Sequence, residues 1–193
     1  MRPTVAPTPT PTVYPLSPRS CIDRAVFGER AASAYVLPYP VGESYMVLQS
    51  VCSDPGSHRN QLAYDFEMPI GADVTAARGG VVMLAWDNTP DIGTKQYQGQ
   101  ANYIYIRHED GTVAFYAHLK QDSVTVGRGD QVKMGQRIAA SGNSGYTGEI
   151  PHLHFGVYAW WPPEEGYDVP VNFRNATAFG ALLPQGRYLA LEY

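Results

Sequence analysis

Two histidines separated by a single leucine are the residues of this chain best suited to do chemistry. His152 and His154 lie in the run PHLHFGV, which predicts a β-strand. Because strand side chains alternate between two faces, both imidazoles point to one side and Leu153 to the other. Two imidazoles on one face suit a metal site or acid–base catalysis. The motif alone leaves open a pair of solvated surface histidines, since such short patterns also occur by chance.

Three further side chains could complete such a site. Asp65 lies between two aromatic residues in a predicted strand, His58 lies upstream in a turn-rich segment, and His118 ends another predicted strand. A catalytic zinc site usually takes three protein ligands from histidine, aspartate or glutamate and keeps one position for water. Each of these residues taken alone is more often solvated, so the pattern by itself leaves the ligand set open.

Short β-strands must position these side chains. Alternating or apolar segments are separated by turns rich in glycine, proline and asparagine, and helical periodicity is absent. The predicted strands are 45–49, 62–66, 73–76, 80–86, 103–108, 112–118, 136–141 and 152–158. The pair Asp110-Gly111 suits a type I′ hairpin turn. We expect an all-β fold, mainly antiparallel and barrel- or sandwich-like, with long surface loops and at most short helices, such as one near 25–34.

The composition separates a linker from a folded domain. The chain has 193 residues, enough for one domain with its own core. Residues 1–20 are rich in proline, threonine and serine, which favours a disordered, extended linker, and residues 21–193 are expected to form a single domain. The two cysteines, Cys21 and Cys52, form either one disulfide or two free thiols.

Charge and hydropathy exclude several classes of protein. The net charge of −4 and the lack of a basic patch argue against a nucleic-acid partner. No apolar stretch is long enough to span a membrane. The first residues lack the apolar region of a signal peptide, which fits either a cytoplasmic protein or one whose signal has been removed.

A series of motifs runs in fixed order through residues 35–175. In sequence, they are SH (57–58), YDF (64–66), PIGADV (69–74), AARGGVV (76–82), HEDGT (108–112), YAHL (116–119), VKMGQ (132–136), SGNSG (141–145) and PHLHF (151–155). The series resembles the lysostaphin- or LytM-type zinc metallopeptidases, which have the duplicated hybrid motif fold and cleave peptide crosslinks of bacterial peptidoglycan. An ordered series is far more specific than any one of its motifs.

The resemblance assigns a role to each candidate residue. It implies one zinc ion per chain, held by His58, Asp65 and His154. It implies that His118 and His152 are catalytic and not bound to the metal. The zinc-activated water would attack the scissile carbonyl, with the two catalytic histidines acting as acid–base and oxyanion stabiliser.

One spacing departs from the family pattern. Three residues usually separate the first histidine from the aspartate, which would place that histidine at position 61, where this chain has Gln61. His58 and Asp65 are seven positions apart and would not share a face of a regular strand. We therefore expect the loop 56–60 to curl His58 back toward Asp65. His108 matches a hairpin position with no family role and is expected to be exposed.

The resemblance also implies a substrate and a location. The expected function is that of a zinc metalloendopeptidase acting on peptidoglycan peptide stems, outside the cytoplasm, as a monomer. It leaves open whether D-Ala–diaminopimelate crosslinks or glycine bridges are cleaved. Specificity is expected in the loops 87–101 and 160–168.

Three alternatives come from other classes of protein. A non-catalytic LytM-type module that activates or binds cell-wall hydrolases would lack some site residues, whereas this chain has all five. A cupin-type metal protein needs a glutamate shortly after His-x-His, and Phe155-Gly156-Val157 does not supply one. A carbohydrate-binding module would use exposed tryptophans, for which Trp86, Trp160 and Trp161 are candidates.

Overall fold

Antiparallel strands make up most of the regular structure of this protein. The computed structural model describes residues 24–53, 56–59, 61–164, 167–178 and 180–193. Its strands are β1 (Ser44–Gln49), β2 (Ala63–Glu67), β3 (Asp73–Thr75), β4 (Gly80–Trp86), β5 (Tyr103–Arg107), β6 (Val113–Ala117), β7 (Gln131–Val132), β8 (Arg137–Ala140), β9 (Leu153–Tyr158) and β10 (Arg187–Leu189). Three 3-10 helices accompany them: η1 (Arg24–Phe27), η2 (Arg30–Ala32) and η3 (Lys95–Tyr97). The predicted all-β fold class is confirmed.

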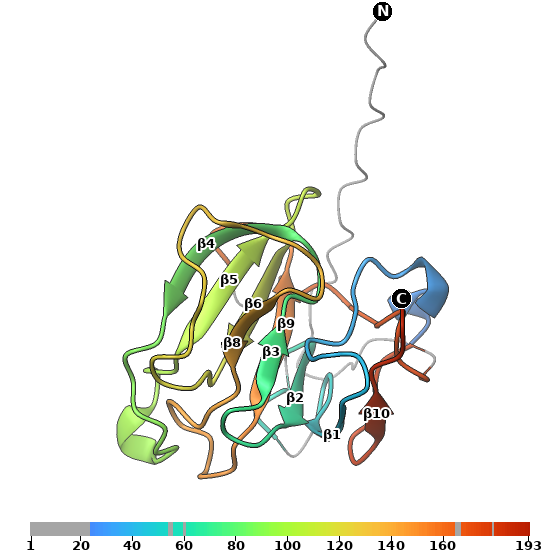
Figure 1. Ribbon diagram of the computed structural model, residues 1–193. Helices are drawn as coiled ribbons and strands as arrows, with labels where there is room; N and C mark the ends of the chain where they lie inside the picture. The colour runs from blue at the N-terminus through green and yellow to red at the C-terminus, as the bar shows by residue number, and fades with distance from the viewer. Residues whose placement is uncertain (1–23, 54–55, 60, 165–166, 179) are drawn as a thin grey trace, which may run out of the picture.

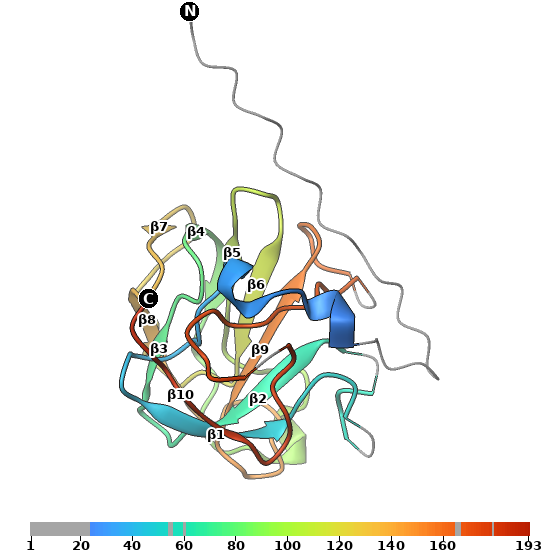
Figure 2. The same cartoon turned by 90° about the vertical axis from the view of Figure 1, so that its right-hand side faces the viewer.

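The strands form one large and one small sheet. Eight strands follow the order β10-β1-β2-β9-β6-β5-β4-β7, and β3 pairs with β8. All the strand pairs of the described residues are antiparallel. Figure 1 shows the large sheet as strongly twisted, with β3 and β8 in front of it. Figure 2 shows β1 and β10 running side by side at the opposite edge from β4 and β7.

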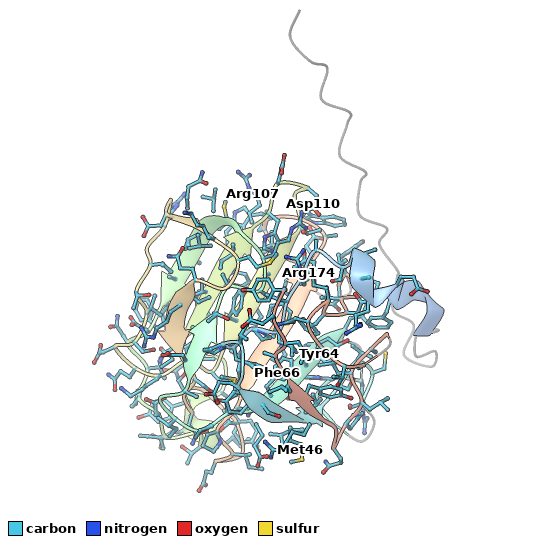
Figure 3. The ribbon with its side chains drawn as sticks, turned by 45° about the vertical axis from the view of Figure 1, so that its right-hand side comes forward. Met46, Tyr64, Phe66, Arg107, Asp110 and Arg174 are labelled. Carbon is cyan, nitrogen blue, oxygen red and sulfur yellow. The ribbon has the colours of Figure 1, made fainter. Side chains whose placement is uncertain are left out.

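The core lies against one face of the large sheet. Tyr64 and Phe66 of β2, together with Leu153 and Phe155 of β9, are buried in a cluster that also contains Val74 of β3. Figure 3 labels Tyr64 and Phe66 in the interior of the molecule. Because side chains alternate along a strand, the residues between them point to the opposite face of the sheet. The packing of the core therefore determines which residues lie on the opposite, outer face of the sheet.

The structure refines the predicted elements in three places. The strands β7 and β10 were not predicted, because runs of two or three residues are too short to show a period of two. The expected helix near 25–34 is replaced by η1 and η2, between which Gly28 takes a φ of +64°. The hairpin after β5 is present, but of its turn residues 109–111 only Gly111 has a positive φ, so the predicted type I′ turn is wrong.

His108 is a correction to the sequence analysis. It is only 3% exposed, not exposed as expected, and its Nδ1 donates a hydrogen bond to the Gly79 carbonyl at 2.9 Å. An ion pair of 2.5 Å between Asp110 and Arg78 joins the hairpin turn to the segment that carries Gly79. Figure 3 shows Asp110 next to Arg107, at the far end of the molecule from Met46.

Two predictions concern residues that the structure does not describe. The linker over 1–20 lies outside the described residues, as does Cys21, so its disulfide with Cys52 stays a prediction. Across the described part of the chain, no helix combines the length and apolar character needed to cross a bilayer.

Candidate metal centre

Two candidate ligands face each other across neighbouring strands. Asp65 of β2 is the register partner of His154 of β9, so both side chains leave the same face of the sheet. The Nδ1 atom of His154 lies 2.9 Å from the Asp65 carboxylate. Because Tyr64 and Phe66 point into the core on either side of Asp65, the register of β2 cannot slip without burying the carboxylate among apolar residues.

His58 reaches the same point from the loop before β2. Its Nε2 lies 3.2 Å from an Asp65 oxygen and 3.3 Å from Nδ1 of His154, and the residue is 1% exposed. The loop curls through two backbone hydrogen bonds, from Gln61 N to the His58 carbonyl and from Cys52 N to the Gln61 carbonyl. The curl accounts for the unusual spacing, and Gln61 is not part of the cluster.

The three side chains have the chemistry of a zinc site. Their ligand atoms all lie within 4.8 Å of one another, and among the described residues they form the one such group of His, Cys, Asp or Glu. Two imidazole nitrogens and one carboxylate oxygen match the protein donor set of a catalytic zinc site. The donor atoms of this cluster therefore fit zinc.

The electrostatics of the cluster keep the aspartate ionised. Burial alone would raise the pKa of Asp65, but hydrogen bonds from His154 and His58 outweigh it and hold the pKa well below its usual value. Burial lowers the pKa of His154, whereas the contact with Asp65 outweighs burial and raises that of His58. A charged carboxylate between two imidazoles is the state that binds a divalent cation.

Gln49 is a site residue that sequence analysis missed. It is the register partner of Asp65 on β1 and donates a hydrogen bond from Nε2 to Asp65 Oδ2 at 3.0 Å. Its Oε1 accepts the backbone N–H of Ser57 at 2.8 Å. One amide thus orients the carboxylate and fastens the loop that carries His58. Only the pairing of β1 with β2 reveals it, because no motif surrounds Gln49 in the sequence.

His118 and His152 lie together beside the three candidate ligands. Their ring centroids are 4.6 Å apart, and His152 Nε2 is 3.7 Å from an Asp65 oxygen. His118 donates from Nδ1 to the Ser144 carbonyl at 2.7 Å, and His152 donates from Nδ1 to the Ile150 carbonyl at 2.8 Å. A carbonyl only accepts, so each neutral ring carries its proton on Nδ1 and leaves Nε2 as a base.

His118 is held in a strained backbone conformation. Its φ is +61°, a region that non-glycine residues rarely adopt. The next residue, Leu119, gives its carbonyl oxygen to two buried side chains, the amide of Asn102 at 3.0 Å and the hydroxyl of Ser144 at 2.7 Å. Burial, with smaller effects from His152 and His154, lowers the pKa of His118 to about 3, so the ring is neutral near pH 7.

Tyr116 has no place in this site. It is fully buried, and its hydroxyl accepts a hydrogen bond from the Ala77 backbone at 2.8 Å. It is a core residue, as its inward position on β6 requires.

A cleft gives access to these histidines. A cavity of about 360 Å³ is lined by His118, His152 and His154 together with Asp65, and a second of about 290 Å³ shares His118 and His154. Tyr146, 49% exposed, borders both cavities. A larger cavity of about 760 Å³ lies by the His108 hairpin, but its lining contains no cluster of metal-binding groups. Chemistry, and not size, identifies the cleft as the candidate site.

One of the two loops expected to set specificity forms a wall of this cleft. Gln98, Gly99 and Ala101 of the loop 87–101 line the smaller cavity. The loop is tied to the segment that carries Ser144, because Asp91 accepts the backbone N–H of Asn143 at 2.8 Å.

Comparison with known proteins places this cleft in a family. The model of peptidase family M23 matches residues 59–172. The chain is 38% identical over 92 residues to the peptidoglycan DD-endopeptidase ShyA of Vibrio cholerae, and 36% identical over 120 residues to lysostaphin of Staphylococcus simulans. These alignments cover 47% and 61% of this chain but only 18% and 19% of the two relatives.

Solved structures share the fold. The catalytic domain of the prophage-encoded M23 protein EnpA from Enterococcus faecalis aligns with a TM-score of 0.51 at 23% identity, over 68% of this chain and 93% of that chain. The SpoIIQ–SpoIIIAH pore-forming complex aligns with a TM-score of 0.51 at 19% identity, over 71% and 87%. Because one fold occurs in both a catalytic domain and a pore-forming complex, activity has to be argued from the site.

Proposed function

This chain belongs to peptidase family M23, and from that premise we propose that it is a zinc endopeptidase that hydrolyses peptide crosslinks of bacterial peptidoglycan. Two of its relatives are named for endopeptidase activity, one on peptidoglycan and one on glycyl-glycine bonds. The proposal includes one zinc ion per chain, a monomeric protein, a location outside the cytoplasm, and peptide stems as substrate.

The observation that carries the proposal is the convergence of five side chains from four separate segments. His58, Asp65 and His154 bring their ligand atoms within 4.8 Å of one another. His118 and His152 line the same cleft without belonging to that group. A structural ion pair would need no second pair of histidines with oriented rings, whereas peptide hydrolysis needs both a Lewis acid and groups that move protons.

We assign the metal to His58 Nε2, Asp65 and His154 Nδ1. A bound zinc ion would supply a Lewis acid and a water of lowered pKa. The protein's part is to orient the carboxylate through the hydrogen bond from the Gln49 amide, which uses neither of the two ligand nitrogens. Gln49 also fixes the geometry of the loop, because it binds the backbone next to His58.

We assign proton transfer to the Nε2 atoms of His118 and His152. Each ring is fixed by its Nδ1–H bond to a backbone carbonyl, so its lone pair on Nε2 is available in the neutral form. One ring accepts the proton of the attacking water, and the protonated form of a ring then stabilises the oxyanion or protonates the leaving amine. Hydrolysis is complete when the carboxyl and amine products carry the elements of that water.

Digestion of purified peptidoglycan tests the proposal. Peptidoglycan with D-Ala–diaminopimelate crosslinks and peptidoglycan with glycine bridges are each incubated with the protein, with and without a chelator, and the products are identified by mass. We expect a new amine and a new carboxyl end from one of the two, lost with chelator and restored by zinc. If neither substrate yields a chelator-sensitive product, the protein is instead a non-catalytic module of the same fold.

A further inference from the structure

The catalytic role proposed for His118 requires that its imidazole keeps one orientation, although the residue lies just beyond the end of a strand. β6 ends at Ala117, and His118 follows with a φ of +61°. A non-glycine residue persists in this conformation only where the surrounding structure over-determines it. The hydrogen bonds around His118 therefore show what holds its side chain in place.

One buried residue, Ser144, contacts this region through two different groups. Its backbone carbonyl accepts the Nδ1–H of the His118 imidazole at 2.7 Å. Its side-chain hydroxyl donates to the carbonyl of Leu119, the residue that follows His118, also at 2.7 Å. Ser144 is 0% exposed, so solvent does not reach its hydroxyl. The imidazole and the backbone that carries it are thus bonded to the same residue.

Asn102 orients the hydroxyl of Ser144 in turn. The backbone N–H of Asn102 donates to that hydroxyl at 2.9 Å, which leaves the hydroxyl proton for the Leu119 carbonyl. The side-chain amide of Asn102 donates to the same Leu119 carbonyl at 3.0 Å and to the Thr89 carbonyl at 2.8 Å. Its oxygen accepts the Thr89 N–H at 2.8 Å. A buried network whose donors are all paired rigidifies the residues that it contains.

The turn that carries Ser144 packs closely against the segment that carries Asn102. Gly145 has a φ of +79°, and a Cβ atom at this position would lie 2.9 Å from the Cα of Ala101. Glycine therefore permits the approach that brings the Ser144 hydroxyl to the Asn102 N–H. The packing of the turn thus sets the position of this hydroxyl.

We propose that the hydroxyl of Ser144 is a positioning group for the proton transfer assigned to His118. It holds the backbone at Leu119 in place relative to the Ser144 carbonyl, so that the Nδ1 proton stays on that carbonyl and Nε2 stays free for the attacking water. Ser144 lines neither cavity of the cleft, so it acts through His118. The inference rests on the proposed function, because it takes His118 as a base.

Removal of the hydroxyl tests the proposal in the full chain. Ser144→Ala keeps the backbone carbonyl that binds Nδ1 and loses the bond to Leu119. We expect kcat on a crosslinked peptide to fall by about 100-fold, because a displacement of about 1 Å can have an effect of that size. KM and zinc content should stay at wild-type values, because no candidate ligand or cleft residue is changed. Ser144→Cys, which keeps a side chain of similar size but donates weakly, should lose less.

A second readout needs no turnover. The Nδ1 proton of His118 is hydrogen-bonded, so it should give an imidazole N–H signal in the proton–nitrogen NMR spectrum of the wild type, assigned by its absence in His118→Ala. We expect exchange to broaden or remove this signal in Ser144→Ala. Thr112→Val is the matched control, because it removes a buried hydroxyl bonded to Asp110 and Tyr35 at the far end of β6. It should keep both the signal and the wild-type kcat, and urea denaturation verifies that each variant is folded.

Wild-type kcat in folded Ser144→Ala, or an unchanged Nδ1 signal in that variant, would overturn the proposal. A loss of zinc or a rise in KM as large as the fall in kcat would also overturn it, since the hydroxyl would then support the cleft as a whole. If Ser144→Ala does not fold, Ser144→Cys decides by the same criteria. Failure of the proposed function is separate, because it shows as absent cleavage by the wild type, whereas the NMR comparison still tests what holds His118.

Discussion

The buried carboxylate of Asp65 is the residue on which the candidate metal centre depends. At 2% exposure it accepts hydrogen bonds from His154 and Gln49 and lies 3.2 Å from His58. An ionised carboxylate is tolerated in such a place only when its oxygens are paired. Each of these neighbours therefore affects both the charge of Asp65 and its orientation toward a cation.

Replacement of Gln49 should lower the affinity of the protein for zinc without removing a metal ligand. In Gln49→Leu the amide that binds both Asp65 and the backbone of Ser57 is lost, while the volume is nearly kept. Partners that orient metal ligands usually contribute about 10- to 100-fold to affinity. We expect zinc affinity, measured by competition with a chromogenic chelator, to fall within that range. Gln61→Ala, on the same loop but outside the cluster, should bind zinc as wild type does; equal affinity in Gln49→Leu would remove Gln49 from the site.

Replacement of His118 should separate catalysis from metal binding. His118→Ala removes a base that is not among the three candidate ligands. Loss of a positioned proton-transfer group typically costs about 10²- to 10⁴-fold in turnover. We expect kcat on a crosslinked peptide to fall by that amount while the zinc content stays at the wild-type level. Wild-type kcat in this variant would contradict the proposed role.

Sequence analysis predicted the histidines and the aspartate of the candidate site but not the residues that hold them in place by hydrogen bonds. The curl that brings in His58 was expected from its spacing to Asp65 together with the family resemblance, and the structure places that side chain next to Asp65. Gln49 and Asn102 could not be found in this way, because their roles depend on cross-strand register and on a buried turn. His108 was expected to be exposed for a related reason: only the tertiary packing of its hairpin buries it.

At the scale of elements, the pairing of β2 with β9 positions the candidate ligands. Inward residues of both strands are apolar and buried, so the register Asp65 to His154 is fixed by the core. Each of the eight predicted strands overlaps a strand of the structure. The turn type after β5 was wrong because Asp-Gly pairs also occur where glycine alone takes the positive φ, as here at Gly111.

The β5–β6 hairpin should make folding stability sensitive to acid through His108. Burial lowers the pKa of this imidazole from 6.5 to about 4. Between those pH values the unfolded chain binds a proton that the folded chain does not. The free energy of unfolding therefore falls as the pH is lowered from 7 to 4, by up to about 3 kcal/mol.

Urea denaturation of the wild type and of His108→Gln at several pH values measures this effect. The difference between the two free energies of unfolding should change by about 3 kcal/mol between pH 7 and pH 4, because the wild type loses more stability than His108→Gln does. A difference that is constant with pH would mean that His108 titrates normally and is not buried in solution.

At the scale of the whole molecule, the two faces of the large sheet have different roles. Its inner face builds the core, and its outer face carries the candidate metal centre. Loop 87–101 adds a wall, and its docking on the segment around Asn143 links that wall to the backbone that holds His118. The matched residues make up 18% of ShyA and 19% of lysostaphin, so this unit is a small part of such relatives.

Removal of residues 1–20 should leave the folded domain intact. Their composition predicts a linker that contributes no core. We expect the midpoint of thermal unfolding of the truncated chain to match that of the full chain within about 2 °C. A large drop would show that the segment packs on the domain, and a rise in peptidase activity would show that it covers the cleft.

Zinc content tests the central claim most directly. Wild type, Asp65→Ala, Gln61→Ala and His118→Ala are purified in parallel with equal zinc, dialysed and measured for metal by mass spectrometry, with circular dichroism to verify folding. We expect about one zinc ion per chain in the wild type, Gln61→Ala and His118→Ala, and less than about a tenth of that in folded Asp65→Ala. A wild type without zinc, or an Asp65→Ala variant that keeps a full ion, would contradict the assignment of His58, Asp65 and His154 as the metal centre.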